Sequence, residues 1–343
     1  MEESKILLIY TGGTIGMITN PETGALQPFD FSHIFEYIPD LKQFKIQIDS
    51  ISFDQPIDSS DIGIKEWIEL VNIIENNYIN YDGFVILHGT DTMAYSASAL
   101  SFLIQNLNKP IIFTGSQLPI GMLRTDGKEN LITAIEIAAD KFDNGKPKVP
   151  EVCIYFENKL YRGNRTTKYN AEYFDAFSSP NYPPLAEAGI KIKYNRKQIF
   201  YPQLDQFPVF YRKMDENIAI LKIFPGINQS TVKSILNIQG LKGIILETFG
   251  AGNAMSADWF ISLLKEAIAK GIIIYNVSQC VAGSVNMDLY ENGKKLRDMG
   301  VIGGADITLE AAVTKLMFLL GKQMNIHNVK ILLQKNIAGE ITL

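Results

Sequence analysis

Residues 6–16 read Ile6-Leu7-Leu8-Ile9-Tyr10-Thr11-Gly12-Gly13-Thr14-Ile15-Gly16, an apolar run that leads directly into a loop of glycine and threonine. The same arrangement returns at residues 84–92, as Phe84-Val85-Ile86-Leu87-His88-Gly89-Thr90-Asp91-Thr92. If the two apolar runs are neighbouring parallel strands, both loops lie at the carboxyl edge of one sheet, where open α/β folds bind their ligands. We therefore expect Thr14 and Thr90 to lie close together, with Asp91 beside them.

The composition is that of an ordinary globular protein. The chain has 343 residues, of which 46% are hydrophobic and 20% are charged. This length exceeds what one hydrophobic core usually serves, so we expect two domains. The net charge of -5 and the lack of a long basic run disfavour a nucleic-acid partner. No apolar run approaches the length of a membrane span, so no membrane partner is expected.

The cysteines and the amino terminus favour a cytoplasmic location. Cys153 and Cys280 are the two cysteines of the sequence, too few for a disulfide framework. Residues 1–4 carry no basic region of the kind that begins a signal peptide, and Thr14 follows soon after. Cleavage of a signal peptide would remove this threonine, so we expect no secretion by that route.

Strand-like and helix-like segments alternate along the first half of the chain. Strands are expected at 6–10, 45–51, 84–87, 111–114 and 152–156. Helices are expected at 64–81, 92–107 and 127–139 because apolar residues recur there with helical spacing. Such alternation predicts βαβ units and a mainly parallel sheet.

The pattern breaks between residues 178 and 206 and then resumes. The break contains Ser178-Ser179-Pro180-Asn181-Tyr182-Pro183-Pro184, which is typical of turns. After it, strands are expected at 218–223, 243–246 and 272–277, and helices at 230–238, 257–270, 308–320 and 326–334. We therefore predict a larger α/β domain at 1–190, a linker at 191–216 and a smaller α/β domain at 217–343.

Several common kinds of active site are disfavoured. The three histidines, His33, His88 and His327, lack the spacing of metal ligands, and no Cys-x-x-Cys occurs, so no metal site is expected. No Gly-x-Ser-x-Gly elbow is present. The loop at 12–16 matches neither the dinucleotide-binding fingerprint nor the P-loop. A plain tight turn is the ordinary interpretation of such a loop.

A threonine nucleophile requires a base, because its hydroxyl is a weak nucleophile. With histidine scarce, we expect a lysine held neutral, or a tyrosine. Lys168 is a candidate, in the segment 160–168 that follows the expected strand at 152–156. Taken alone, that segment is equally well explained as a solvated basic loop.

A further loop, Asp58-Ser59-Ser60-Asp61, precedes the expected helix at 64–81. Its hydroxyls and backbone amides suit a substrate carboxylate. Taken alone, simple helix capping is the better explanation of this loop.

Four segments together resemble the motifs of the bacterial-type L-asparaginases, most closely the type I, cytoplasmic branch. They are Thr11-Gly12-Gly13-Thr14-Ile15-Gly16-Met17, His88-Gly89-Thr90-Asp91-Thr92-Met93, Thr114-Gly115-Ser116-Gln117-Leu118-Pro119 and Arg162-Gly163-Asn164-Arg165-Thr166-Thr167-Lys168. The resemblance runs along nearly the whole chain. It implies two α/β domains, a homotetramer built as a dimer of dimers with sites at the dimer interface, and hydrolysis of L-asparagine to L-aspartate and ammonia without a cofactor.

The resemblance also implies roles for the catalytic residues. Thr14 matches the nucleophile, which would form a β-aspartyl ester. Thr90 would handle or position a proton or water, and Lys168 would tune that hydroxyl. Asp91 would bind the α-ammonium group of the substrate.

The remaining matched residues would bind substrate. The loop of Asp58, Ser59 and Ser60 would hold the α-carboxylate, and the backbone of Ser116 would face the amide. Backbone N–H groups near Gly13 and Thr90 would hold the oxyanion. Asn253 matches a residue that reaches across the dimer. This set suits a small zwitterion, which needs an anion acceptor and a cation acceptor close to the nucleophile.

One departure from the family concerns the loop after the first motif. The family usually has a tyrosine there that contacts the nucleophile, whereas residues 20–28 contain none, and Ala25 or Leu26 stands in its place. Either another group activates Thr14 or the loop closes differently.

Three other functions stay open. A sensor that binds asparagine or aspartate would need no nucleophile, and the missing tyrosine favours it. An ammonia-producing amidotransferase subunit would carry a further amino-terminal domain, whereas only a few residues precede the first expected strand here. A preference for glutamine is the third, because one methylene changes binding by only ~1–3 kcal/mol.

Overall fold

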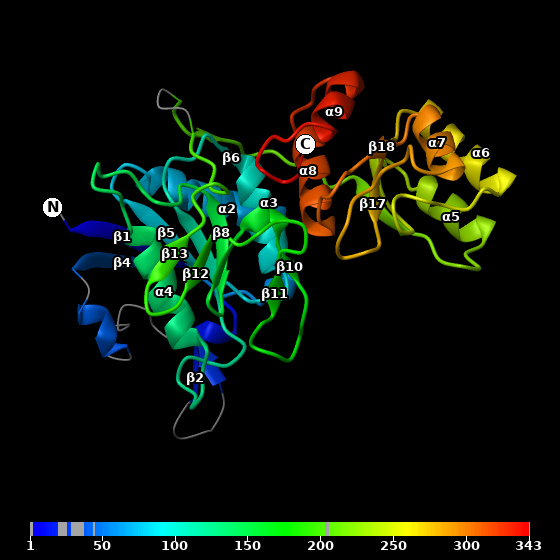
Figure 1. The fold of residues 1–343 in the computed structure, drawn as a ribbon. Coiled ribbons are helices and arrows are strands. Elements are labelled where there is room, and N and C mark those ends of the chain that lie inside the picture. Colours follow the sequence, from blue (N-terminus) through cyan, green and yellow to red (C-terminus); the bar gives the residue numbers. More distant parts are fainter. Residues whose placement is uncertain (1–2, 20–25, 29–37, 44, 203–205, 343) are drawn as a thin grey trace. The chain divides into compact units, whose positions relative to one another are not determined.

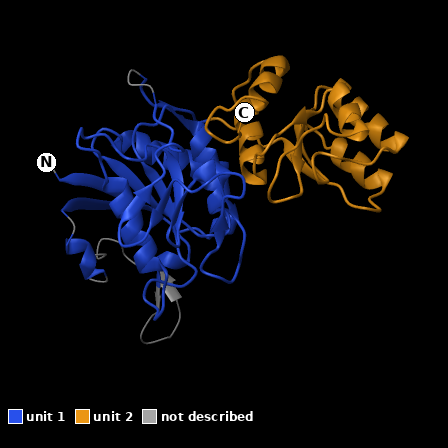
Figure 2. Cartoon of the chain, viewed as in Figure 1, with its two compact units in different colours: residues 1–212 blue, residues 213–343 orange. Residues whose placement is uncertain are grey.

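The structure is a computed structural model that describes residues 3–19, 26–28, 38–43, 45–202 and 206–342. It divides into two compact units, residues 1–212 and 213–343 (Figure 2). Each unit has its own hydrophobic core. The expected α/β class with two α/β domains is confirmed.

Unit 1 is built on one large, mainly parallel sheet (Figure 1). Its strands are β1 (Ser4–Tyr10), β4 (Ile46–Ser52), β5 (Gly83–Leu87), β7 (Ile111–Thr114), β8 (Val152–Phe156), β9 (Lys159–Arg162), β12 (Ala186–Ala188) and β13 (Ile192–Tyr194). Their order in the sheet is β13-β12-β9-β8-β7-β5-β1-β4. The strands from β8 to β4 run parallel, and β9, β12 and β13 form an antiparallel edge.

The centre of this sheet confirms the parallel pair expected from the two glycine loops. Strands β1 and β5 are parallel neighbours, and Tyr10 lies opposite Leu87. Residues 6–9 and 84–87 are fully buried, which is typical of parallel strands covered on both faces. Because the two strands end level with each other, the loops that follow them leave the sheet at the same edge.

Two helices of unit 1 end earlier than predicted, whereas the helix predicted at 127–139 has those bounds. The described helices are α2 (Ile64–Asn77), α3 (Met93–Leu103) and α4 (Gly127–Ala139). Helix α2 stops short of residue 81 because Tyr78 turns inward, where its ring stacks on Phe84 and its hydroxyl donates to Asn108. Helix α3 stops short of residue 107 because residues 104–105 form the short strand β6 (Ile104–Gln105), which pairs with β14 (Val209–Phe210).

The remaining elements of unit 1 are short. Strands β2 (Met17–Thr19) and β3 (Leu26–Pro28) pair with each other, as do β10 (Thr167–Lys168) and β11 (Phe177–Ser178). Single helical turns of the 3-10 type are η1 (Thr14–Gly16), η3 (Pro39–Gln43), η4 (Ser59–Asp61) and η5 (Gly163–Arg165). The range 191–216, predicted as a linker, contains β13 and β14.

Unit 2 contains a smaller, wholly parallel sheet in the order β15 (Ile218–Lys222), β16 (Gly243–Thr248), β17 (Ile273–Ser278) and β18 (Ile302–Gly303). Its helices are α5 (Gln229–Leu236), α6 (Asp258–Ala269), α7 (Glu291–Asp298), α8 (Leu309–Gly321) and α9 (Ile326–Leu333). Helix α7 was not predicted, because it carries no apolar period, and an ion pair joins its Glu291 to Lys295 one turn later. Among the described residues, no helix is both long and apolar enough to cross a bilayer.

Candidate active site

The loop that carries Thr14 depends on two glycines. Gly12 and Gly13 have φ angles of 135° and 86°, which side-chain-bearing residues rarely adopt. A Cβ atom on Gly12 would lie 2.1 Å from the carbonyl oxygen of Ile57, and one on Gly13 would lie 2.5 Å from the backbone nitrogen of Gly89. The Thr14 loop therefore packs, backbone against backbone, on the loop that carries Thr90.

Tyr10 supports the Thr14 loop from the core. Its ring fills the space beside Gly16, and its hydroxyl donates to the Gly16 carbonyl at 3.2 Å. Burial raises the pKa of Tyr10 to about 12, so it is not a base near neutral pH. Within the described part of the chain, the Thr14 hydroxyl has no hydrogen-bond partner, and it is available to a ligand. Of the two positions where the family's tyrosine is expected, Ala25 lies outside the described residues and Leu26 is the first residue of β3.

The structure brings Thr90, Asp91 and Lys168 into contact. The Lys168 ammonium nitrogen lies 2.9 Å from Thr90 Oγ1 and 2.6 Å from Asp91 Oδ1. The Lys168 side chain is 17% exposed, whereas that of Asp91 is 67% exposed. Lys168 therefore lies deeper than Asp91. The Asp91 carboxylate faces solvent, where it can bind a cationic group of a ligand.

Lys168 reaches this position by a path that the sequence pattern did not predict. Strand β8 does not lead directly into the lysine segment. The chain turns back at Glu157 and Asn158, both with positive φ, and forms the antiparallel strand β9. A buried ion pair between Arg162 and Glu151, 2.6 Å long, holds the end of β9, and η5 and β10 then carry the chain to Lys168.

The loop at 58–61 forms the turn η4. The Asp58 carboxylate accepts hydrogen bonds from the Ser60 N–H at 2.9 Å and the Ser60 hydroxyl at 2.8 Å. These bonds lower the pKa of Asp58. Asp58 thus caps the turn, while Ser59 is 3% exposed and packs against Gly89, where an added Cβ would lie 2.6 Å from its Oγ. The turn places Ser59 next to the Thr90 loop.

The loop after β7 contributes Ser116 and Gln117. Ser116 donates its hydroxyl to the Leu118 carbonyl at 2.5 Å, so its side chain is engaged within its own loop. Gln117 was not singled out from the sequence, yet its Oε1 lies 3.3 Å from Thr90 Oγ1. Its position in the motif at residues 114–119 was the available signal.

Asn253 belongs to unit 2 and is described within that unit. It lies in the turn after β16, where its N–H donates to the Phe249 carbonyl at 2.9 Å. Its predicted reach across a dimer stays a prediction.

His88 is a further residue that sequence reasoning did not assign to the site. It lies directly after β5 and is 1% exposed. Its Nδ1 lies 2.7 Å from the Gly89 carbonyl oxygen, and its Nε2 lies 2.8 Å from Ser96 Oγ. Burial lowers its pKa from 6.5 to about 4, so the imidazole is neutral at physiological pH.

This buried imidazole predicts a loss of stability in acid. The unfolded state binds a proton at His88 below pH 6.5, whereas the folded state does so only below about pH 4. Stability therefore falls as the pH drops through this window, by about 2 kcal/mol between pH 7 and pH 5. Denaturant unfolding of the wild type and of His88→Asn at both pH values measures the difference. An equal fall in both proteins would contradict the prediction.

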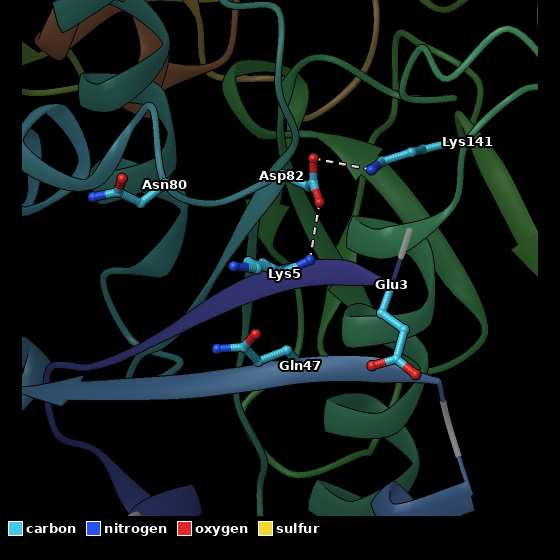
Figure 3. Close-up of a pocket in the computed structure, with 6 residues that line it drawn as sticks. All are labelled: Glu3, Lys5, Gln47, Asn80, Asp82 and Lys141. Carbon is cyan, nitrogen blue, oxygen red and sulfur yellow. Dashed lines mark hydrogen bonds and ion pairs between the residues drawn. The ribbon is translucent and has the colours of Figure 1, made fainter. Parts of the chain in front are cut away.

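A surface hollow of about 510 Å³ lies elsewhere on unit 1 and is separate from these groups. Lys5 and Gln47 contribute to it from the amino-terminal parts of β1 and β4 (Figure 3). Asp82 accepts from the Lys5 N–H and pairs with Lys141, each at 2.9 Å. The hollow lies at the amino-terminal ends of β1 and β4, whereas Thr14 and Thr90 follow the carboxyl-terminal ends of β1 and β5. Its lining residues include no hydroxyl or thiol group. The described residues include no group of ligands suited to a metal ion.

The fold and the site together define an asparaginase-type α/β protein. Two family models match the chain, "Asparaginase, N-terminal" over residues 5–200 and "Glutaminase/Asparaginase C-terminal domain" over residues 217–333. The chain therefore belongs to the asparaginase family, which confirms the resemblance of its motifs.

Individual relatives agree with this assignment. The chain is 42% identical to L-asparaginase 1 of Escherichia coli (strain K12), over 100% of this chain and 99% of that protein. It is 39% identical to the mouse 60 kDa lysophospholipase, over 99% of this chain and 63% of that longer protein. The crystal structure of L-asparaginase I from Vibrio cholerae superposes with a TM-score of 0.90 at 40% identity and covers 99% of this chain and 100% of that one.

Proposed function

We propose that this protein hydrolyses L-asparagine to L-aspartate and ammonia, with Thr14 as the nucleophile. The contact of Lys168 with both Thr90 and Asp91 supports the proposal most strongly. Thr90 and Asp91 lie on the loop against which Gly13 packs, and Lys168 reaches them from β10. In this member of the asparaginase family, a hydroxyl, an ammonium group and a carboxylate thus lie next to the loop of Thr14, whose own hydroxyl has no hydrogen-bond partner among the described residues.

The reaction proceeds in two displacements. Thr14 Oγ attacks the side-chain amide carbon of asparagine and loses its proton, and the backbone N–H groups of Gly13 and Thr90 stabilise the oxyanion. Collapse of this intermediate breaks the C–N bond, and ammonia leaves with the transferred proton. Water then attacks the β-aspartyl ester, with Thr90 and Lys168 positioned to move its proton, and aspartate is released.

The two charged ends of the substrate determine how it is held. The exposed carboxylate of Asp91 binds the α-ammonium, and the Ser59–Ser60 loop binds the α-carboxylate. The partly buried Lys168 contacts the Asp91 carboxylate and fixes its direction. Recognition of both ends rejects analogues that lack either group, whereas the extra methylene of glutamine costs only ~1–3 kcal/mol.

Ammonia release from L-asparagine and, separately, from L-glutamine tests this proposal. We expect release from asparagine with a higher kcat/KM than from glutamine. Asparagine binding without ammonia release would refute the enzyme assignment and indicate a sensor.

We also propose that the active form is a homotetramer, a dimer of dimers, in the cytoplasm. Large apolar side chains near the site support this, since Leu123, Tyr169 and Tyr173 are 93%, 68% and 66% exposed in the single chain. Light scattering of the purified protein should give a mass at least twice the 38.4 kDa of one chain. A fully active monomer would contradict a site completed by a second subunit.

A further inference from the structure

A chain of hydrogen bonds runs through the core of unit 1 and ends at the backbone beside Thr90. The indole Nε1 of Trp67, on α2, lies 2.9 Å from the hydroxyl oxygen of Ser96, on α3. That hydroxyl lies 2.8 Å from Nε2 of His88, whose Nδ1 lies 2.7 Å from the Gly89 carbonyl oxygen. Trp67, Ser96 and His88 are all buried; Trp67 and Ser96 lie on helices, and His88 is the first, buried residue of the loop that carries Thr90.

The groups at the two ends of this series of hydrogen bonds determine where its protons lie. An indole N–H can only donate, and a carbonyl oxygen can only accept. Ser96 therefore accepts from Trp67 and donates to Nε2 of His88. The imidazole proton must then be on Nδ1, from which it donates to Gly89. The imidazole is therefore neutral with its proton on Nδ1. The indole N–H at one end and the carbonyl at the other fix this tautomer, because neither group can exchange its role as donor or acceptor.

The bond to Gly89 fixes one peptide plane. In a trans peptide the carbonyl of one residue and the N–H of the next point in opposite directions, and the described chain contains no cis peptide. The Gly89 carbonyl points at the imidazole, toward α3 and the core. The Thr90 N–H therefore points away from the core, and within the described residues it donates to no acceptor.

The peptide after Gly89 needs such a constraint. Glycine rotates at low cost because it has no side chain. A larger residue does not fit here, since a Cβ on Gly89 would lie 2.6 Å from Ser59 Oγ. The glycine that permits close packing of the Gly13, Ser59 and Thr90 loops thus leaves its own peptide free to flip unless another group holds it.

We propose that His88 is a positioning residue for the hydrolysis, which holds the Gly89–Thr90 peptide so that the Thr90 N–H points at the oxyanion. The inference rests on the proposed function. It assigns no proton transfer to the imidazole, whose task is to donate one fixed hydrogen bond. The oxyanion forms only during the reaction, so the effect of His88 falls on kcat rather than on substrate binding.

Two substitutions at His88 distinguish the hydrogen bond made by Nδ1 from the one made by Nε2. Asparagine places its amide N–H near the position of Nδ1 and keeps the bond to Gly89, whereas glutamine places its amide near Nε2 and loses that bond. We expect His88→Gln to lower kcat by about 10- to 100-fold and to change KM less than about threefold. The Thr90 N–H is misdirected in this variant rather than removed, so the loss is smaller than that of deleting the oxyanion donor. His88→Asn should retain most of the wild-type kcat.

His327→Gln is the matched control, because His327 lies exposed on α9 in unit 2 and should leave both constants unchanged. Equal kcat in His88→Gln and wild type, or a change in KM alone, would overturn the inference.

A measurement on the wild type guards against variants that fail to fold. NMR of ring-15N-labelled histidine should show three imidazoles, one of which is lost in His88→Asn. We expect that ring to carry its proton on Nδ1 and to stay neutral from pH 8 to pH 5. A proton on Nε2 in an active enzyme would overturn this inference alone. A wild type that releases no ammonia would refute the proposed function, and the catalytic role of His88 with it.

Discussion

Thr14→Ala is expected to reduce ammonia release from L-asparagine by on the order of 10⁴-fold or more, because the substitution removes the atom that forms the ester. The fold should be unaffected. Thr14 is partly exposed, and its hydroxyl makes no hydrogen bond within the described residues. The measurement is kcat for ammonia release, with a thermal melt of both proteins to show equal stability.

Thr14→Ser is the matched control for this experiment. It keeps a hydroxyl at the same position and should keep measurable turnover. A folded Thr14→Ala protein with activity comparable to Thr14→Ser would show that Thr14 is not the nucleophile.

Lys168→Met is expected to lower kcat by roughly 100- to 10,000-fold near neutral pH, the range typical of a group that assists proton transfer. Methionine has a similar length but cannot donate, so Thr90 and Asp91 both lose the bonds of 2.9 Å and 2.6 Å. The effect on stability should be small, since Asp91 is 67% exposed and exposed ion pairs contribute at most about 1 kcal/mol. Steady-state kinetics together with denaturant unfolding separates the two effects.

Lys141→Met offers a matched control on the same unit. It breaks the ion pair with Asp82 at the opposite edge of the sheet, and it should leave kcat unchanged (Figure 3). If Lys168→Met lowered kcat less than tenfold, Lys168 would have no part in proton transfer.

The parallel core was predictable because its signals are local. Each apolar run followed by a glycine loop, as in residues 6–16 and 84–92, marks a buried strand and the turn after it. The register of β1 and β5 then places both loops at one edge. The helices of unit 2 were predictable for the same reason, except for α7, whose residues carry no apolar period.

The path of the chain to Lys168 was not predictable in this way. The reversal at Glu157 and Asn158 uses residues with positive φ that are not glycine, so the sequence carries no clear turn signal. The antiparallel strand β9 follows from pairing with β8, which depends on contacts within the sheet rather than on local preference.

The environment of His88 was also beyond the sequence pattern. Its partner Ser96 comes from α3, and Trp67, which donates to Ser96, comes from α2, so only the packing of these two helices brings the three residues together. A lone histidine after a strand gives no sign of such partners. Tyr10 is similar, because its hydroxyl bond to Gly16 depends on how the loop folds back over the strand.

The most direct test of the account is to identify the covalent intermediate. Wild-type protein is mixed with L-asparagine, quenched in acid within milliseconds, digested and analysed by mass spectrometry. We expect a β-aspartyl group on the peptide that contains Thr14, and none on that peptide from Thr14→Ala. Turnover of asparagine with the aspartyl group on Thr90, or with no acylated peptide at all under conditions that trap esters, would contradict the assignment of Thr14.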